Sequence, residues 1–194
     1  MSKKWISTNK NWMISMVSPK LILKSDKIYL RPIILNDVNS NYLSWLHDKE
    51  VMQGIATSGY TLDNLKIYVE DRLLDPNVAF FAICSNDTNE HIGNVKIDFH
   101  DKNANVSELG LLIGNKNYWG KGIGYEACKL AIDYGFNEMH LRKIYLAVYE
   151  NNLNAKKLYE KLGFKLEGTL RKHIMADGEL CDKYLMGIFK EEVQ

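Results

Sequence analysis

The stretch 118–127, YWGKGIGYEA, most constrains the fold of this chain because three glycines alternate with other residues inside it. It follows a strand-like apolar run and precedes a helix-like run. Glycine adopts positive φ without steric cost and lets a backbone approach a ligand closely. A helix N-terminus adds unpaired N–H groups and a partial positive charge. The stretch therefore predicts a cradle for a phosphate or pyrophosphate group at the start of a helix.

The remaining patterns predict a single α+β domain over 20–194, preceded by a leader over 1–19. Alternating or apolar runs predict a strand or a hairpin at 20–34 and strands at 78–84, 92–99, 106–113, 143–149, 164–170 and 180–189. Apolar stripes at helical spacing predict helices at 38–48, 62–74, after the glycine stretch, and at 154–162. This order indicates about seven mostly antiparallel strands, with one central parallel pair and about four flanking helices.

Polar residues and glycine mark where the helices begin and end. Asn36 or Asp37 is expected to cap the helix over 38–48, and Thr61 the helix over 62–74. Gly163 is expected to end the helix over 154–162 in a left-handed conformation.

Composition removes several classes of function. The formal net charge is +1, so no global field attracts nucleic acid. No run approaches the roughly 20 apolar residues that cross a bilayer, so no membrane partner is expected. Cys84, Cys128 and Cys181 lack metal-like spacing, which predicts no metal site and favours a reducing cytoplasm. Trp5 and Trp12 in the leader leave room for a homodimer.

One alternative interpretation of the glycine stretch is a dinucleotide fingerprint. Residues 122–127 fit the pattern G-x-G-x-x-G/A, and Glu150 lies at the end of the next expected strand, where a ribose-binding acid would stand. That motif belongs to repeated βα units, whereas here it follows an antiparallel meander. The chain after Glu150 is also too short for a second half of that fold. A dinucleotide-dependent oxidoreductase therefore remains only as an alternative.

Four segments together resemble the GNAT superfamily of N-acetyltransferases over roughly residues 26–190. The resemblance is to the branch that includes ribosomal-protein N-terminal acetyltransferases and amino-sugar acetyltransferases. The segments are WLHD at 45–48, ELGL at 108–111, WGKGIG at 119–124, and NLNA with LYEKLGF at 152–164. Trp119 departs from the Gln or Arg that is usual in the superfamily, but this branch often has Trp there.

The resemblance implies that the chain moves an acetyl group from acetyl-coenzyme A to a primary amine by direct attack. Backbone N–H groups at the helix start would hold the pyrophosphate. The resemblance also implies that the strand over 106–113 is splayed from the strand over 143–149, which leaves a cleft where the first strand would pair with the pantetheine arm. Tyr159 resembles the general acid that protonates the departing thiolate. The cofactor-binding residues that it implies are Leu109, Leu111, Lys121, Gly122, Ile123, Gly124, Tyr125 and Asn152.

The attacking amine must lose a proton, which requires a base. Glu108 is the first candidate because it lies on the cofactor strand in a run with no other charge. Asp98, His100 and His173 are weaker candidates, since each also suits an ordinary surface position.

The acceptor site of this fold is expected from residues 45–75 and 170–184. Their mixture of aromatic and charged side chains suits a small polar amine such as an amino sugar, and it also suits a peptide N-terminus. A strongly cationic polyamine would favour a more acidic pocket. A non-catalytic module that binds acetyl-CoA remains a further alternative.

Overall fold

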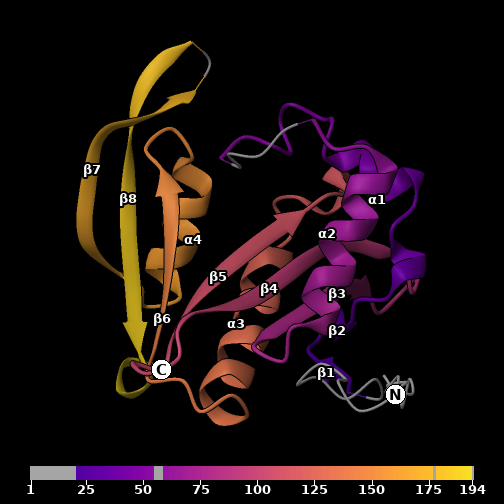
Figure 1. Cartoon of the computed structure of the whole chain (residues 1–194), viewed down its shortest axis with the longest axis horizontal. Coiled ribbons are helices and arrows are strands. Elements are labelled where there is room, and N and C mark those ends of the chain that lie inside the picture. The colour runs from indigo at the N-terminus through magenta and orange to yellow at the C-terminus, as the bar shows by residue number, and fades with distance from the viewer. Residues whose placement is uncertain (1–20, 55–58, 177, 194) are drawn as a thin grey trace, which may run out of the picture.

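A computed structural model describes residues 21–54, 59–176 and 178–193 of the chain. An eight-stranded sheet with the order β1-β2-β3-β4-β5-β6-β8-β7 forms its centre (Figure 1). All neighbouring strands are antiparallel except β5 and β6, which are parallel. The predicted meander and central crossover are therefore confirmed. The expected leader lies outside the described residues.

The strands are β1 (Leu23–Lys24), β2 (Ile28–Pro32), β3 (Val78–Ser85), β4 (His91–Asp101), β5 (Val106–Ile113), β6 (Lys143–Tyr149), β7 (Lys165–Ala176) and β8 (Glu179–Phe189). The α-helices are α1 (Ser40–Trp45), α2 (Leu62–Leu74), α3 (Ile123–Asn137) and α4 (Leu153–Lys161). Short 3-10 turns lie at Leu35–Asp37, Lys116–Tyr118 and Lys190–Glu192. Of the two alternatives for 20–34, the structure shows the hairpin, because the chain turns between β1 and β2, which pair with each other.

Two of the three expected helix boundaries are confirmed. The Thr61 hydroxyl accepts from the Asn64 N–H, and the Asn64 side chain accepts from the Thr61 N–H, which is a capping box. Gly163 follows α4 with φ +95°. The expected cap of the first helix was wrong: Asn39 caps α1. Asp37 is buried instead, and it forms two 2.7 Å hydrogen bonds with the Arg31 guanidinium.

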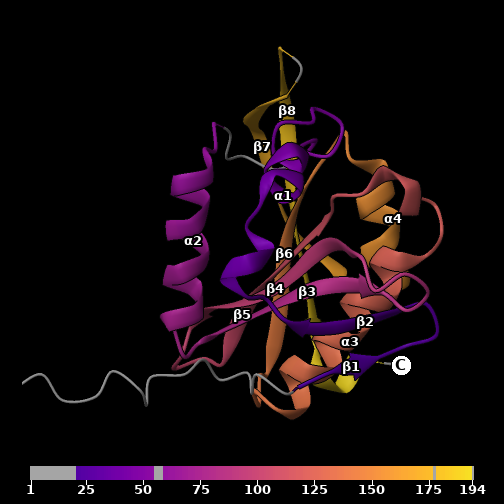
Figure 2. The same ribbon diagram turned by 90° about the vertical axis from the view of Figure 1, so that its right-hand side faces the viewer.

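Helices cover both faces of the sheet (Figure 2). On one face, α3 and α4 cover a core that includes Val95 and Ile97 of β4. On the other face, α1 and α2 cover a second core that includes Phe80 of β3. Because side chains alternate along a strand, Asn94, Lys96 and Asp98 of β4 face α1 and α2. The fold thus places three polar side chains on the second face.

The parallel strands separate part-way along their length. Their ladder contains Val106–Lys143, Ser107–Ile144 and Glu108–Tyr145, and no later pair. Beyond Glu108, β5 continues beside β4, while β6 continues beside β8 as far as Tyr149. The divergence is visible in Figure 1 as β5 leaning away from β6. The predicted splay of the central pair is therefore present.

Candidate functional site

A cavity of about 910 Å³ opens where β5 and β6 diverge. Its walls come from the open ends of both strands, the start of α3, the face of α4, and the sheet face beneath α1 and α2. This volume lies in the range of sites for small molecules and cofactors. The sequence-predicted residues that line it are Glu108, Leu109, Leu111, Gly122, Ile123, Gly124, Tyr125, Asn152 and Tyr159.

The open edge of β5 carries unpaired backbone groups. The Gly114 N–H bonds to the Ile92 carbonyl of β4. Since backbone groups alternate sides along a strand, the N–H groups of Leu109, Leu111 and Ile113 are directed away from β4. The Trp119 indole N–H donates to the Ile113 carbonyl at 2.8 Å, which supports this alternation. The wedge therefore offers the Leu111 N–H group to a ligand, whereas the Leu109 N–H is directed at the Tyr145 carbonyl of the last parallel pair.

The glycine stretch forms the predicted helix start. Gly122 is the N-cap of α3 with φ +81°, a conformation that favours glycine. Its carbonyl accepts the first helical bond, from the Glu126 N–H. Among the described residues, the N–H groups of Ile123, Gly124 and Tyr125 have no backbone acceptor. Three donors and the positive end of the helix dipole thus meet at the cavity, as an anion requires.

Contacts around the loop fix its position. The Glu126 carboxylate accepts from the Ser25 hydroxyl at 2.6 Å and from the Lys27 N–H at 3.1 Å. The Lys27 ammonium donates to the Lys121 carbonyl at 2.9 Å. These bonds tie the glycine loop to the turn between β1 and β2. The lowered pKa of Glu126 fits the same contacts, because they outweigh the burial that opposes it.

Two loop residues differ in detail from the expectation. The Lys121 side chain is exposed, is not part of the cavity wall, and places its ammonium 5.6 Å from the centre of the Tyr118 ring. A Cβ on Gly124 would lie 3.3 Å from the side chains of both Leu111 and Leu158. Gly124 therefore also permits close packing of α3 against β5 and α4, apart from any role toward phosphate.

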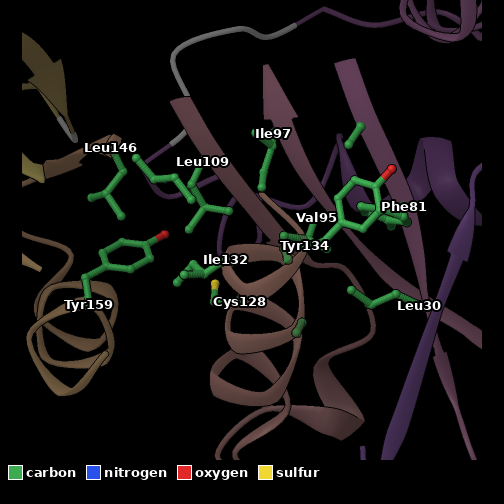
Figure 3. Close-up of a cluster of buried hydrophobic side chains, with 14 of the residues drawn as sticks. Leu30, Phe81, Val95, Ile97, Leu109, Cys128, Ile132, Tyr134, Leu146 and Tyr159 are labelled. Carbon is green, nitrogen blue, oxygen red and sulfur yellow. The ribbon is translucent and has the colours of Figure 1, made fainter. Parts of the chain in front are cut away.

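Tyr159 lies on the buried face of α4 and still reaches the cavity wall. Tyr159 is 7% exposed, and its ring packs edge-on to the Phe164 ring, with 5.9 Å between the ring centroids. In Figure 3 the hydroxyl end points away from α4, toward Ile132 and Leu109. Burial raises the pKa of Tyr159 well above its usual value near 10, so the phenol keeps its proton. The side chain is thus a proton donor held inside the wedge.

Asn152 connects the two sides of the cavity. Its side-chain oxygen accepts from the Ala155 N–H at 3.1 Å and so caps α4. Its side-chain nitrogen donates to the Gln53 carbonyl at 3.2 Å. Gly54 has φ +98°, and a Cβ there would lie 2.8 Å from that nitrogen. The structure therefore gives Asn152 a structural role in the loop after α1 and at the start of α4.

Glu108 lies at the point where the strands separate. It is exposed, stands opposite Asp98 of β4, and is in register with Tyr145 of β6. Burial, the Glu108 charge and a hydrogen bond to Glu108 raise the pKa of Tyr145 to about 12. No ion pair to Glu108 is found within the described part of the chain. This carboxylate is thus hydrogen-bonded to Tyr145 but has no cationic partner in the described ranges.

The weaker base candidates lie in other surroundings. Asp98 lines the cavity, but its carboxylate is 2.8 Å from the Lys96 ammonium. His100 and His173 are exposed and are not part of the cavity wall. His100 packs on the Tyr145 ring at 5.3 Å.

The sequence interpretation predicted one acceptor segment and missed the part of the wall that comes from the strands. The expected segment 45–75 lines the cavity with Tyr60 and Tyr68, whereas 170–184 contributes only Lys183 among the described residues. Residues outside both expected segments also line it; they include Tyr42 of α1, Phe80 of β3, and Asn94 and Lys96 of β4. The alternation of Asn94, Lys96 and Asp98 with Val95 and Ile97 is the signal that could have revealed the polar part of this wall.

The described residues contain no group of three or more His, Cys, Asp or Glu side chains that could hold a metal ion. No helix within the described ranges is both long and apolar enough to cross a bilayer.

Comparison with known proteins identifies the family. The profile of the acetyltransferase (GNAT) domain matches residues 27–165. The chain belongs to the GNAT acetyltransferase family. It is 31% identical over 175 residues to p20 of Bacillus licheniformis, named an uncharacterized N-acetyltransferase, covering 88% of this chain and 97% of that protein. It is 40% identical over 81 residues to spermidine N(1)-acetyltransferase of Escherichia coli K12, covering 42% of this chain and 44% of that protein.

Solved structures share the fold. The spermidine N-acetyltransferase of Vibrio cholerae, crystallised with CoA and spermine, matches with a TM-score of 0.78 at 24% identity. The match covers 85% of this chain and 96% of that chain. This GNAT member is accordingly an N-acetyltransferase that uses acetyl-CoA. The wedge with its free β5 donors and the N–H cradle of α3 fit that co-substrate.

Proposed function

We propose that this GNAT enzyme acetylates the primary amine of a small molecule by direct attack on acetyl-CoA. The observation that carries the proposal is the arrangement of the cavity. One continuous space joins the donor wedge, which has Tyr159 in its wall, to a polar face beneath α1 and α2. The amine would enter over the polar face and meet the thioester in the wedge.

Acetyl-CoA supplies a thioester whose acetyl carbon is open to attack. The N–H groups of Ile123, Gly124 and Tyr125 would hold its pyrophosphate. The Leu111 N–H would bind its arm at the carbonyl oxygen and stabilise negative charge there, and Leu109 would line the wedge beside it. These assignments are supported by the absence of other backbone acceptors for these groups at the α3 start and by the alternation along β5.

Two side chains would move protons. Glu108 would take the proton of the ammonium, directly or through water, which frees the lone pair for attack. Tyr159 would give its proton to the departing thiolate, since it is protonated and lies in the wedge wall. The first step needs a proton acceptor and the second needs a proton donor. The Glu108 carboxylate and the buried Tyr159 phenol would fill these two roles at different places in the wedge.

Polyamines are a second candidate class for the acceptor amine. Both spermidine acetyltransferases in the comparison act on such amines by name. The free carboxylate of Glu108 is the feature in this cavity that would favour a cation. A peptide N-terminus and an amino sugar are the remaining candidates.

Release of free thiol from acetyl-CoA, measured with amino sugars, short peptides and polyamines, tests the proposal. We expect release that depends on one class of amine, with N-acetyl product found by mass spectrometry. Binding of acetyl-CoA without release with any amine would instead support a non-catalytic module. We also infer a reducing compartment such as the cytoplasm, supported by three free cysteines, and keep the homodimer as a prediction.

A further inference from the structure

An unused hydrogen-bond donor lies in the acceptor side of the cavity. Asn94 of β4 is 4% exposed and lines the cavity. Its side-chain oxygen bonds to His91 Nε2 at 3.0 Å, while its side-chain nitrogen has no partner within the described residues. A buried donor without a partner costs about 1–3 kcal/mol. Such a group in a binding cavity indicates that a ligand atom completes its bonding.

A hydrogen bond to His91 holds this amide. Since an amide oxygen only accepts, His91 Nε2 carries the proton of that bond. His91 packs edge-on against the rings of Tyr42 and Trp45, with centroid distances of 6.0 and 5.1 Å. Burial lowers the pKa of His91, so the ring is neutral and its Nδ1 carries no proton. The Asp37 carboxylate, 4.0 Å from that Nδ1, therefore bonds to the Arg31 guanidinium and not to His91.

Lys96 supplies a second donor on the same face, two residues along β4. Its ammonium donates to Asp98 at 2.8 Å and to the Tyr68 hydroxyl at 3.3 Å, which leaves one of its three N–H groups. Gly110 stands opposite Lys96 on β5, and a Cβ there would meet nothing within 4 Å. Open space therefore lies beside Lys96 and close to Asn94.

Resting on the function proposed above, we propose that Asn94 determines acceptor specificity by donating a hydrogen bond to an oxygen atom of the amine substrate. The substrate class is then a primary amine with a hydroxyl, carbonyl or carboxylate oxygen close to the amino group. Lys96 supports the same oxygen-bearing region, and His91 is a positioning residue that holds the amide of Asn94.

This inference separates oxygen-bearing amines from polyamines. A protonated polyamine has N–H donors and methylene groups, but no hydrogen-bond acceptor. It would leave Asn94 unpartnered and place another cation beside Lys96. A site that is built to bond a substrate oxygen discriminates strongly against analogues that lack it, because its own polar groups are left unpaired.

The test compares matched amines by kcat/KM: 2-aminoethanol with propylamine, glucosamine with cyclohexylamine, and spermidine with both oxygen-bearing amines. We expect the oxygen-bearing member of each pair to be preferred by roughly 5- to 150-fold, the equivalent of the unpaired-donor cost. Spermidine should fall below both oxygen-bearing amines. Equal or better use of spermidine would overturn the inference while leaving acetyl transfer intact. Failure of every amine would overturn the proposed function and this inference with it.

Two substitutions test the residue itself. Asn94→Leu removes the amide, and Asn94→Asp keeps an oxygen while removing the donor. Both should bring the ratio of kcat/KM between the oxygen-bearing and the oxygen-free amine close to one. The affinity for acetyl-CoA, measured by isothermal titration calorimetry, should stay unchanged. Asn41→Leu on the exposed surface of α1 should keep the preference. A folded Asn94→Asp enzyme that kept the preference would overturn the assignment, and if neither variant folded, the matched amines with the unaltered enzyme would still decide it.

Discussion

Glu108 and Tyr145 form the last register pair between the parallel strands β5 and β6. Beyond this pair each strand follows its other neighbour, so the sheet opens into a wedge. Glu108 thereby stands at the inner end of the opening, and the free N–H group of Leu111 follows it. The divergence of two strands thus brings a candidate base and backbone donors into one cavity.

Replacing Tyr159 by Phe should lower kcat by about 100-fold, the lower end of what general acid–base groups contribute. KM for acetyl-CoA should stay nearly constant, since the ring and its packing on Phe164 remain. Steady-state kinetics measure both values, and Tyr29→Phe on β2 is the matched control. A fully folded Tyr159→Phe enzyme with unchanged kcat would exclude the phenol from proton transfer.

The pH profile of kcat offers a second view of Tyr159. Because burial raises its pKa above the usual value near 10, its proton should remain in place throughout the range from pH 6 to 9.5. We therefore expect no descending alkaline limb in this range from the general acid. A descending limb near pH 8 that disappears in Tyr159→Phe would contradict the view that Tyr159 is buried and stays protonated in this range.

Glu108→Gln should reduce kcat/KM by about 100-fold near pH 7, because the amine then reaches its free-base form without help. The loss of kcat/KM relative to the wild type should become smaller as pH rises, since the fraction of unprotonated amine in solution grows. Glu160→Gln on the exposed side of α4 is the control. An equal deficit at all pH values would show that Glu108 does not act as the base.

Gly122→Val should weaken binding of acetyl-CoA, measured by isothermal titration calorimetry. Its φ of +81° strains any residue with a Cβ, at a cost of about 1–2 kcal/mol, and the neighbouring N–H groups would shift. Gly178→Val has a similar φ of +84° at the β7–β8 turn and should leave affinity unchanged. Unaltered affinity in folded Gly122→Val would remove this loop from the pyrophosphate site.

His91 should make the protein less stable in mild acid. Burial lowers its folded pKa below the unfolded value near 6.5, so its contribution is present above that value and is lost as pH falls toward the folded pKa. The free energy of unfolding should fall by up to about 1.4 kcal/mol per pH unit between pH 6.5 and 5. Urea unfolding of the wild type and His91→Gln measures it; an identical slope in both would contradict the assignment.

Much of the fold follows from local pattern. The strands over 106–113 and 143–149 were predicted to the residue, because both runs are apolar and clear turn signals flank them. The wrong cap at Asp37 has another cause. Its carboxylate bonds to Arg31 of β2, six residues earlier, and to the Ile34 N–H, and the capping rule applied to 38–48 contains no information about these contacts.

The donor half of the site was predictable because it depends on short motifs and backbone geometry. The acceptor half was predictable only in part: the segment 45–75 was expected to line it, but the contribution of β4 depends on which strand face meets α1 and α2. Alternation along β4 places Asn94 and Lys96 on one face, and only the fold shows that this face lines the cavity. The bond from Asn94 to His91 depends on rotamers that the sequence pattern does not determine.

A crystal structure of the enzyme with acetyl-CoA tests the central claim most directly. The account predicts the pantetheine arm between β5 and β6, with the thioester carbonyl within hydrogen-bond distance of the Leu111 N–H. It also predicts the pyrophosphate on the N–H groups of residues 123–125. An arm that lies outside the wedge, or a pyrophosphate away from the start of α3, would contradict the account.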